Sequence, residues 1–226
     1  MTDNQHLPLM PEILDLREAV SRAPFPALPT ACMSKIDEID VEPHHAAIGA
    51  HHRFPTVTFR GATWDLSHLD TFAFRADVGP YDSPLLIDVV VLFSCHCFTR
   101  GTDGFATSAA SESYADGREV RILCEERYLL SRRFLPQIVK ELFSRKIRVA
   151  SDRPNYVTLE TVDLPHPGFY LMFFEVTKDL ARKKRLLLRV QSAYRVDALT
   201  ARQRNAGKVN FDVLLRATYE GRKIKG

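Results

Sequence analysis

Apolar and polar residues alternate along much of the second half of the chain, with the period of two that is typical of half-buried β-strands. In residues 185–195, Leu186, Leu188 and Val190 share one side, and Arg189 points to the other. The same alternation occurs in three further segments, residues 156–162, 169–177 and 209–219. Because the links between these segments are rich in turn residues and charge, the pattern predicts a basic four-stranded antiparallel meander over residues 155–219.

A helical period precedes the meander. Between residues 126 and 144, Leu130, Phe134 and Ile138 recur at helical spacing, with arginines and lysines between them. This spacing predicts the main helix of the chain, with an apolar side on which the meander packs. Pro136 lies inside the segment, and an interior proline either kinks a helix or splits it.

The first half of the chain is β-rich over residues 54–124. Strand-like segments occur at residues 56–60, 71–76, 85–99 and 118–123. The polar run 101–117 between the last two is longer than most hairpin loops. Residues 1–53 are acidic, hold six of the thirteen prolines, and offer one short helix at residues 11–23. We therefore predict an α+β protein in which an acidic extension, residues 1–53, precedes one domain, residues 54–226.

Positive charge is concentrated in the last quarter of the chain. The net charge is +3, but residues 178–226 contain 14 lysines and arginines against 4 acidic residues. The last link, residues 196–208, has room for a short helical turn and contributes Arg202, Arg204 and Lys208. This distribution is expected for a surface that binds a polyanion, and it is equally consistent with a solvated basic rim.

The sequence lacks the marks of membrane insertion and export. No stretch approaches the roughly 20 apolar residues of a transmembrane helix. The N-terminus lacks the basic and apolar regions of a secretory signal. We therefore expect a cytoplasmic protein with no membrane contact.

The cysteines and histidines leave several readings open. Cys95 and Cys97 are two apart and are expected to be buried free thiols, although a zinc site completed by Cys124 or His68 is an alternative. The histidine pairs at residues 44–45 and 51–52 lie in a segment that we expect to be exposed. The chain has no phosphate-binding glycine loop, dinucleotide fingerprint or metalloprotease motif. We predict no cofactor and no bound metal.

The alternation also predicts which side chains occupy the face of the meander that points away from the helix. They are Tyr156, Glu160, Arg189, Gln191, Arg195, Asp212 and Arg216. Tyr194 falls on the apolar face by strict alternation, unless a β-bulge intervenes. Arg189, Gln191 and Arg195, together with the three cations of the last link, are the candidate nucleic-acid contacts.

A main helix followed by four antiparallel strands, with arginines over the open face, resembles the barnase/EndoU/colicin/RelE group of ribonucleases and ribonuclease toxins. The similarity covers residues 126–224 and includes the segment RLLLRVQSAYRVD. It concerns topology more than sequence. The resemblance implies cleavage of RNA without a metal, by attack of the ribose 2′-hydroxyl on the adjacent phosphate.

Such a reaction needs a base, an acid, and cations for the charge that develops on the phosphoryl oxygens. In the meander, Glu160 is the candidate base, Arg189 and Arg216 the candidate phosphate clamp, and His166 the candidate acid. Tyr194 is an alternative acid or a platform for base stacking.

A second candidate set is the histidine pair His68 and His96, which are the acid and base of a two-histidine ribonuclease if they meet, as in the EndoU branch. The structural alternative for His96 is a half-buried residue bonded to a carboxylate such as Asp65 or Asp70.

Together these observations favour a bacterial or phage-type protein that binds RNA or another polyanion through its basic sheet, with toxin-like endoribonuclease activity as the specific hypothesis. The principal alternative is a non-enzymatic adaptor or inhibitor from a mobile element or phage-defence system, whose basic sheet docks an acidic protein partner. Convergence of the arginines favours the enzyme, whereas dispersed arginines and an exposed apolar patch favour the adaptor.

Overall fold

The structure is a computed structural model that describes residues 36–39, 53–80, 82–102, 112–117, 119–150, 155–162 and 166–224. For residues 36–39, 155 and 160–162 it describes the backbone alone. The short helix predicted at residues 11–23 and the paired histidines at residues 44–45 and 51–52 lie outside the described residues.

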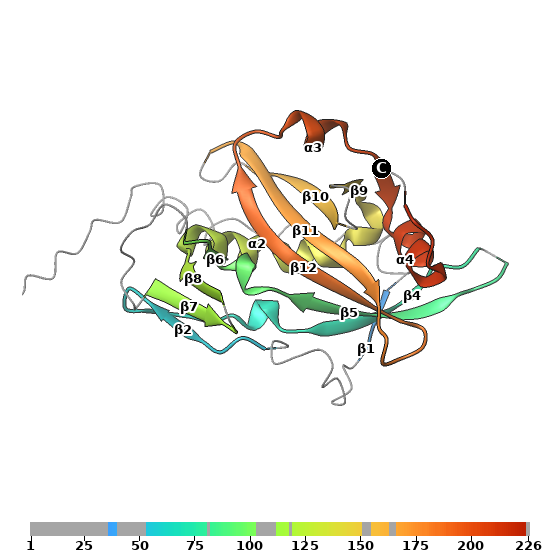
Figure 1. The fold of residues 1–226 in the computed structure, drawn as a ribbon, viewed down its shortest axis with the longest axis horizontal. Coiled ribbons are helices and arrows are strands. Elements are labelled where there is room, and N and C mark those ends of the chain that lie inside the picture. Colours follow the sequence, from blue (N-terminus) through green and yellow to red (C-terminus); the bar gives the residue numbers. More distant parts are fainter. Residues whose placement is uncertain are drawn as a thin grey trace, which may run out of the picture.

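One eight-stranded mixed sheet runs through the protein, in the order β1-β4-β5-β12-β11-β10-β9-β13 (Figure 1). Its strands are β1 (Ile36–Ile39), β4 (Phe72–Asp77), β5 (Leu86–Phe93), β9 (Lys146–Val149), β10 (Asn155–Val162), β11 (Gly168–Lys178), β12 (Arg185–Val196) and β13 (Lys208–Asn210). All neighbouring strands are antiparallel except β5 and β12, which pair in parallel from Arg185 opposite Asp88 to Val190 opposite Phe93. This parallel pair joins the β-rich first half to the meander.

Two helices bury their apolar sides in one core on the same face of this sheet. Helix α2 (Glu125–Lys140) contributes Leu130, Leu135 and Ile138, and helix α4 (Phe211–Glu220) contributes Phe211 and Leu214. The α+β class is therefore confirmed, and α2 packs on β11 and β12 of the meander as predicted, with α4 as a second helix on the same face. None of the helices in the described part of the chain is long and apolar enough to cross a membrane.

Helix α2 runs through Pro136 without splitting. Glu125 and Glu126 occupy its first turn, where carboxylates are favourable. The helix ends at Lys140 and is followed by a 3-10 turn, η6 (Leu142–Ser144). The predicted helix over residues 126–144 is thus an α-helix with a 3-10 turn after it.

The predicted strand over residues 209–219 is wrong, because most of it is helix α4. Phe211, Leu214 and Leu215 recur at helical spacing and are fully buried. Gly221, in the left-handed region with φ of 76°, ends the helix as glycine commonly does. The last strand of the meander region is the short β13 before this helix, and the fourth strand next to β10 is β9, which was not predicted.

Two small sheets complete the first half. One pairs β2 (Val57–Phe59) with β3 (Ala62–Trp64), and the other has the order β6-β8-β7, with β6 (Thr99–Arg100), β7 (Ser113–Asp116) and β8 (Glu119–Leu123). Strand β7 lies within the run predicted as a loop. The predicted strand over residues 85–99 is interrupted after Phe93 by a 3-10 turn, η4 (Cys95–Cys97). Helix α3 (Ala201–Asn205) confirms the helical turn expected in the last link.

Candidate functional site

A β-bulge in the β11–β12 pair changes which side chains of β12 share a face. Phe174 pairs with Val190, but Phe173 pairs with Ser192, so Gln191 is the extra residue. Beyond the bulge the alternation inverts. Arg195 pairs with Tyr170, which is fully buried against Phe134 of α2. The predicted position of Arg195 on the open face is therefore wrong, and Tyr194 takes that face.

Arg195 stabilises the end of the sheet. Its Nη2 donates to the carbonyl oxygens of His166 and Pro167 at 3.2 and 3.3 Å, and its Nη1 lies 2.9 Å from Asp197 Oδ1. A Cβ on Gly168 would lie 3.1 Å from the Nε of Arg195. The guanidinium of Arg195 thus packs over Gly168, and its hydrogen bonds connect β12 to the β10–β11 turn.

Among the residues predicted to carry catalysis in the meander, Arg189, Arg216 and His166 lie on different elements. Arg189 is exposed on β12 with its Nε 3.7 Å from Glu175 Oε1, as in an ordinary cross-strand pair. Arg216 lies on α4 and not on the sheet. Glu160 belongs to β10, but its side chain lies outside the described part, and His166 is exposed in the β10–β11 turn.

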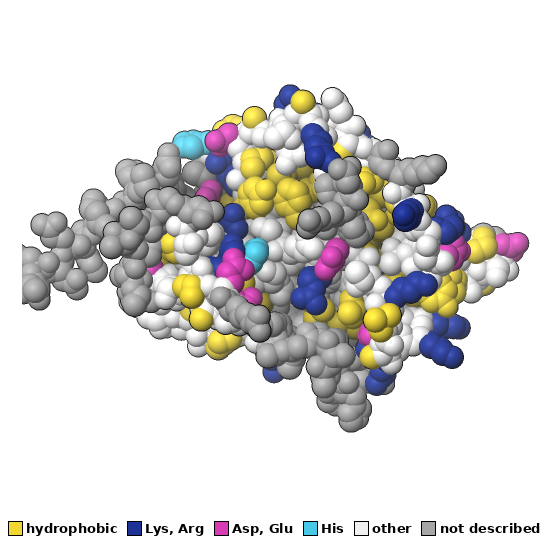
Figure 2. Space-filling model, viewed as in Figure 1, with side chains coloured by type: hydrophobic (Ala, Val, Ile, Leu, Met, Phe, Trp, Pro, Cys, Tyr) yellow, Lys and Arg dark blue, Asp and Glu magenta, His cyan; other side chains and the backbone are white. Residues whose placement is uncertain are grey.

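The predicted nucleic-acid contacts are likewise spread over several elements. Arg202 and Arg204 are exposed on α3, Lys208 is exposed on β13, and Gln191 is half-buried in the bulge. On the face drawn in Figure 2, basic side chains lie in several groups, with more of them toward the β11–β12 hairpin than elsewhere. On this face the described basic side chains therefore do not form one continuous surface.

His68 lies in the 3-10 turn η3 (Ser67–Leu69) and is half-buried. Its Nε2 is 2.9 Å from Ser131 Oγ of α2, and its ring meets that of Tyr128 edge-on at 6.0 Å. Burial lowers the pKa of His68 to about 4. No contact among the described residues joins His68 to His96, so the predicted histidine pair is not brought together.

His96 lies in η4, where the chain leaves β5. The Ser94 Oγ accepts a hydrogen bond from the backbone N–H of His96 at 3.1 Å and caps the turn. This side-chain cap explains why the strand stops at Phe93. The imidazole of His96 remains about one-third exposed, with 35% of the side-chain surface accessible.

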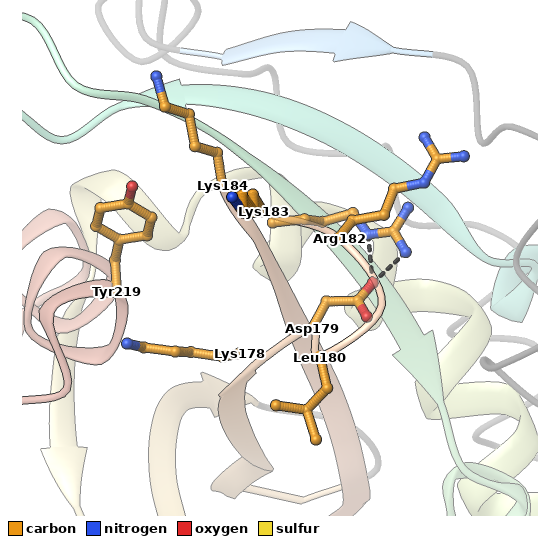
Figure 3. A pocket seen from close by; sticks show the side chains of 8 residues that line it. Lys178, Asp179, Leu180, Arg182, Lys183, Lys184 and Tyr219 are labelled. Carbon is orange, nitrogen blue, oxygen red and sulfur yellow. Dashed lines mark hydrogen bonds and ion pairs between the residues drawn. The ribbon is translucent and has the colours of Figure 1, made fainter.

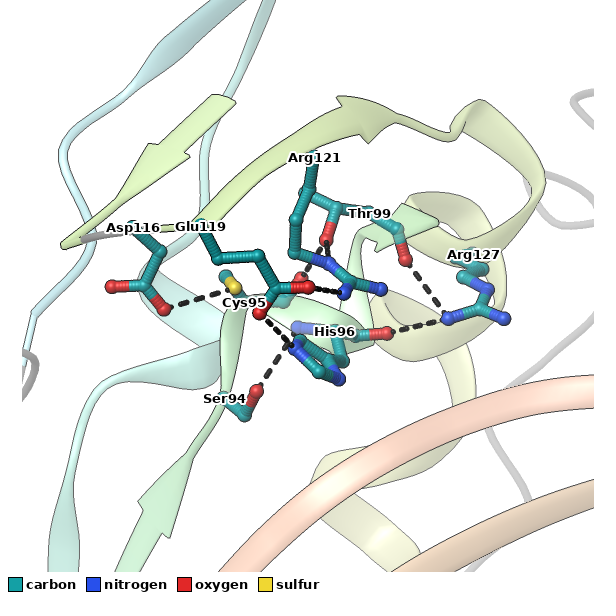
Figure 4. Close-up of polar contacts among 8 residues, drawn as sticks. All are labelled: Ser94, Cys95, His96, Thr99, Asp116, Glu119, Arg121 and Arg127. Carbon is teal, nitrogen blue, oxygen red and sulfur yellow. Dashed lines mark hydrogen bonds and ion pairs between the residues drawn. The ribbon is translucent and has the colours of Figure 1, made fainter. Parts of the chain in front are cut away.

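Strand β8 supplies an acidic and a basic partner to His96 (Figure 4). Glu119 Oε2 lies 3.5 Å from His96 Nε2, and the other carboxylate oxygen of Glu119 is held by Arg121. Arg121 is buried, and its Nε donates to Thr99 Oγ1 at 2.8 Å. Because the guanidinium of Arg121 is bonded both to Thr99 and to Glu119, it holds the Glu119 carboxylate beside the imidazole.

Helix α2 adds a second arginine. Nη1 of Arg127 donates to the carbonyl oxygens of His96 and Thr99 at 3.0 and 2.9 Å. Its guanidinium carbon also lies 5.0 Å from the centre of the Tyr194 ring, within the range of a cation–π interaction. Tyr194 stacks on Phe173 with ring centroids 5.5 Å apart. The bulge makes this arrangement possible, since it turns Tyr194 out of the core.

These residues form one candidate centre, which we call the His96 site. It consists of His96, Thr99, Glu119, Arg121, Arg127, Phe173 and Tyr194. Burial, and next the charge of Arg121, lower the pKa of His96 below its usual value, although Glu119 acts in the opposite direction. His96 is therefore neutral near pH 7, in the form that can accept a proton.

The neighbouring cysteines are protonated thiols. Cys95 donates to Asp116 Oδ2 at 3.0 Å, and burial raises the pKa of Cys95 and of Cys97 to about 12. Cys95, Cys97 and Cys124 are free cysteines. Within the described ranges, no group of three histidine, cysteine or acidic side chains is arranged to hold a metal ion.

Sequence reasoning found His96 and named Tyr194, but it missed the arginines and Glu119. Glu119, Arg121 and Arg127 come from elements that alternation alone does not place beside η4. The one sequence signal for this site was that a β-bulge would move Tyr194 from the apolar face to the open face.

A comparison with protein-family models finds that the YjaZ family matches residues 56–219. This range includes every residue of the His96 site. No curated protein and no solved structure matches the chain.

Proposed function

The chain belongs to the YjaZ family, and we propose that this member is a cytoplasmic RNA-binding protein that cleaves RNA at the His96 site without a metal ion. The observation that carries the proposal is a neutral, partly exposed histidine set between a carboxylate and two arginines, beside a stacked aromatic pair. Neutral imidazole serves as a general base, guanidinium groups stabilise phosphoryl oxygens, and aromatic rings stack on unpaired bases.

In the proposed reaction His96 accepts the proton of a ribose 2′-hydroxyl, and the 2′-oxygen attacks the adjacent phosphorus. The bond from phosphorus to the 5′-oxygen breaks, and that oxygen takes a proton from water. The hydroxide that remains takes the proton from His96, which returns the imidazole to its neutral form. The products are a 2′,3′-cyclic phosphate and a free 5′-hydroxyl. Glu119 orients the ring through Nε2, which leaves Nδ1 as the basic nitrogen. Both hydrogen bonds described for Arg127 use Nη1, so other N–H groups of its guanidinium can meet the phosphate.

The test is incubation of the purified chain with a 5′-hydroxyl single-stranded RNA in EDTA, with cleavage followed by gel and binding by fluorescence anisotropy. We expect cleavage by the wild type and a loss of at least about 100-fold in rate for His96→Gln, since a general base contributes on that order. His166→Gln is the matched control, because His166 is exposed in the β10–β11 turn and is not one of the residues of the His96 site, and it should retain the wild-type rate. A His96→Gln protein that cleaves as fast as the wild type would refute the assignment.

A non-enzymatic adaptor is the second candidate, and the dispersal of Arg189, Arg195 and Arg216 favours it. If the wild type binds RNA but cleaves it at no salt concentration, the chain is an RNA-binding protein without ribonuclease activity. Absence of both binding and cleavage would reject the RNA proposal and leave an acidic protein partner as the hypothesis. In either nucleic-acid case affinity should fall steeply as salt rises, because binding releases counterions.

A further inference from the structure

The connection between β11 and β12 forms a pocket that is separate from the His96 site. It has a volume of about 510 Å³ and is lined by residues 178–180 and 182–185 together with Tyr219 of α4 (Figure 3). Pockets of about 300–1,000 Å³ commonly hold small molecules. This pocket has room for more than one phosphate group.

A buried ion pair fixes the shape of the hairpin. Asp179 accepts a hydrogen bond from Arg185, and both residues are less than one-tenth exposed. The other oxygen of Asp179, Oδ1, accepts from the backbone N–H of Ala181 at 2.8 Å. The turn is thus built around one carboxylate whose charge is matched by Arg185.

The remaining charge of the pocket is positive. Asp179 is the only acidic residue among the eight that line it, and the other charged lining residues besides Arg185 are Lys178, Arg182, Lys183 and Lys184. All four are exposed. Like charges so close in sequence and space repel each other, and an anion between them removes that repulsion.

The side chains differ in direction. In Figure 3, Lys178 and Lys184 extend to the side of the hairpin on which Tyr219 lies, whereas Arg182 points away from Tyr219. The cations near Tyr219 are therefore spread along the pocket and do not meet at one point. Such spacing suits several linked phosphates better than a single one.

Lys184 also has an unfavourable backbone conformation. Its φ is 59°, in the left-handed region that lysine rarely adopts. Its carbonyl oxygen accepts a hydrogen bond from the N–H of Asp88 at 3.0 Å, which holds this conformation in place. A glycine would fit the turn better, so the presence of lysine here points to a use for its ammonium group.

We propose that this pocket binds an oligophosphate chain, with Lys178, Lys183 and Lys184 contacting the phosphates and Tyr219 closing one side. The ligand class is a linear di- or triphosphate. It can come as inorganic triphosphate, as a nucleoside triphosphate, or as the 5′-triphosphate end of an RNA.

The experiment is isothermal titration calorimetry of the full chain with inorganic triphosphate, and with sulfate at equal ionic strength as the reference anion. We expect saturable binding of one triphosphate per chain, and about tenfold weaker binding for Lys184→Gly, because one charge-assisted contact is lost. Since glycine relaxes the left-handed position, Lys184→Gly should keep or raise the melting temperature, and weaker binding then cannot result from unfolding.

Arg189→Ala is the matched control. It also removes one exposed positive charge from β12, but Arg189 pairs with Glu175 and does not line the pocket. We expect less than about a threefold change, because salt screens exposed charges that do not contact the ligand. No saturable binding, or equal losses in Lys184→Gly and Arg189→Ala, would overturn the inference.

Two further titrations identify the source of the phosphates. ATP tests the nucleotide, and a 5′-triphosphorylated oligoribonucleotide is compared with its 5′-hydroxyl form. The inference does not rest on RNA cleavage at the His96 site. Binding of inorganic triphosphate without binding of 5′-hydroxyl RNA would support the oligophosphate pocket and refute the proposed function. Binding and cleavage of 5′-hydroxyl RNA without binding of triphosphate would refute the pocket and support the proposed function.

Discussion

His68 and His96 show how two histidines that sequence alone cannot rank come to occupy different environments. In both, burial is the largest cause that lowers the pKa. Both side chains are half-buried, but His68 lies against the Ser131 hydroxyl and the Tyr128 ring, whereas His96 lies beside the Glu119 carboxylate. Because a neighbouring carboxylate orients an imidazole and favours its protonated form, this difference makes His96 the candidate base of our proposal.

The pKa of His68 predicts how stability depends on pH. The unfolded chain binds a proton at His68 near pH 6.5, while the folded chain does so only near pH 4. The unfolded state therefore binds more protons in this window, and the stability that His68 contributes above pH 6.5 is lost as the pH falls toward 4. We expect this loss to reach roughly 3 kcal/mol.

Urea unfolding at a series of pH values between about 7 and 4 checks this expectation. His68→Gln should lose part of the wild-type slope of unfolding free energy against pH. An unchanged slope in His68→Gln would show that this residue is not responsible.

At the scale of elements, alternation located three strands of the meander and failed where one apolar pattern fits both a strand and a helix. Strands β10, β11 and β12 lie within a residue of their predicted bounds. In α4, apolar residues at positions 211, 213, 215 and 217 satisfy a strand period, and those at 211, 214 and 215 satisfy a helical one. Packing against the core determines whether the segment forms a strand or a helix, and the local sequence does not indicate where the core lies.

Two neighbouring substitutions in α4 separate these readings. Leu214 is fully buried and Val213 is partly exposed. Leu214→Ala should cost about 2–5 kcal/mol of unfolding free energy, and Val213→Ala less than about 1.5 kcal/mol. Chemical denaturation measures both. A strand over this segment would place Val213 in the core and reverse the order.

At the scale of the molecule, the His96 site depends on contacts that are remote in sequence. Its residues come from η4, β6, β8, α2, β11 and β12. Only the parallel pairing of β12 with β5 brings the end of the meander beside η4. Parallel neighbours can be far apart in the chain, and so the composition of this site could not be predicted from sequence, although His96 itself could.

The same pairing predicts that the part of the chain from α2 onward cannot fold alone. A fragment of residues 125–224 would lose β5, leaving the inner edge of β12 unpaired and removing Val89, Val91 and Phe93 from the core. We expect the full chain to show a cooperative thermal transition and dispersed amide resonances, and this fragment to lack both. Circular dichroism and a two-dimensional NMR spectrum decide it. A cooperatively folded fragment would mean that the meander and α2 form an independent unit, with β5 as an accessory strand. Then the His96 site would lie at the junction of two separable parts, because His96, Thr99, Glu119 and Arg121 precede the fragment.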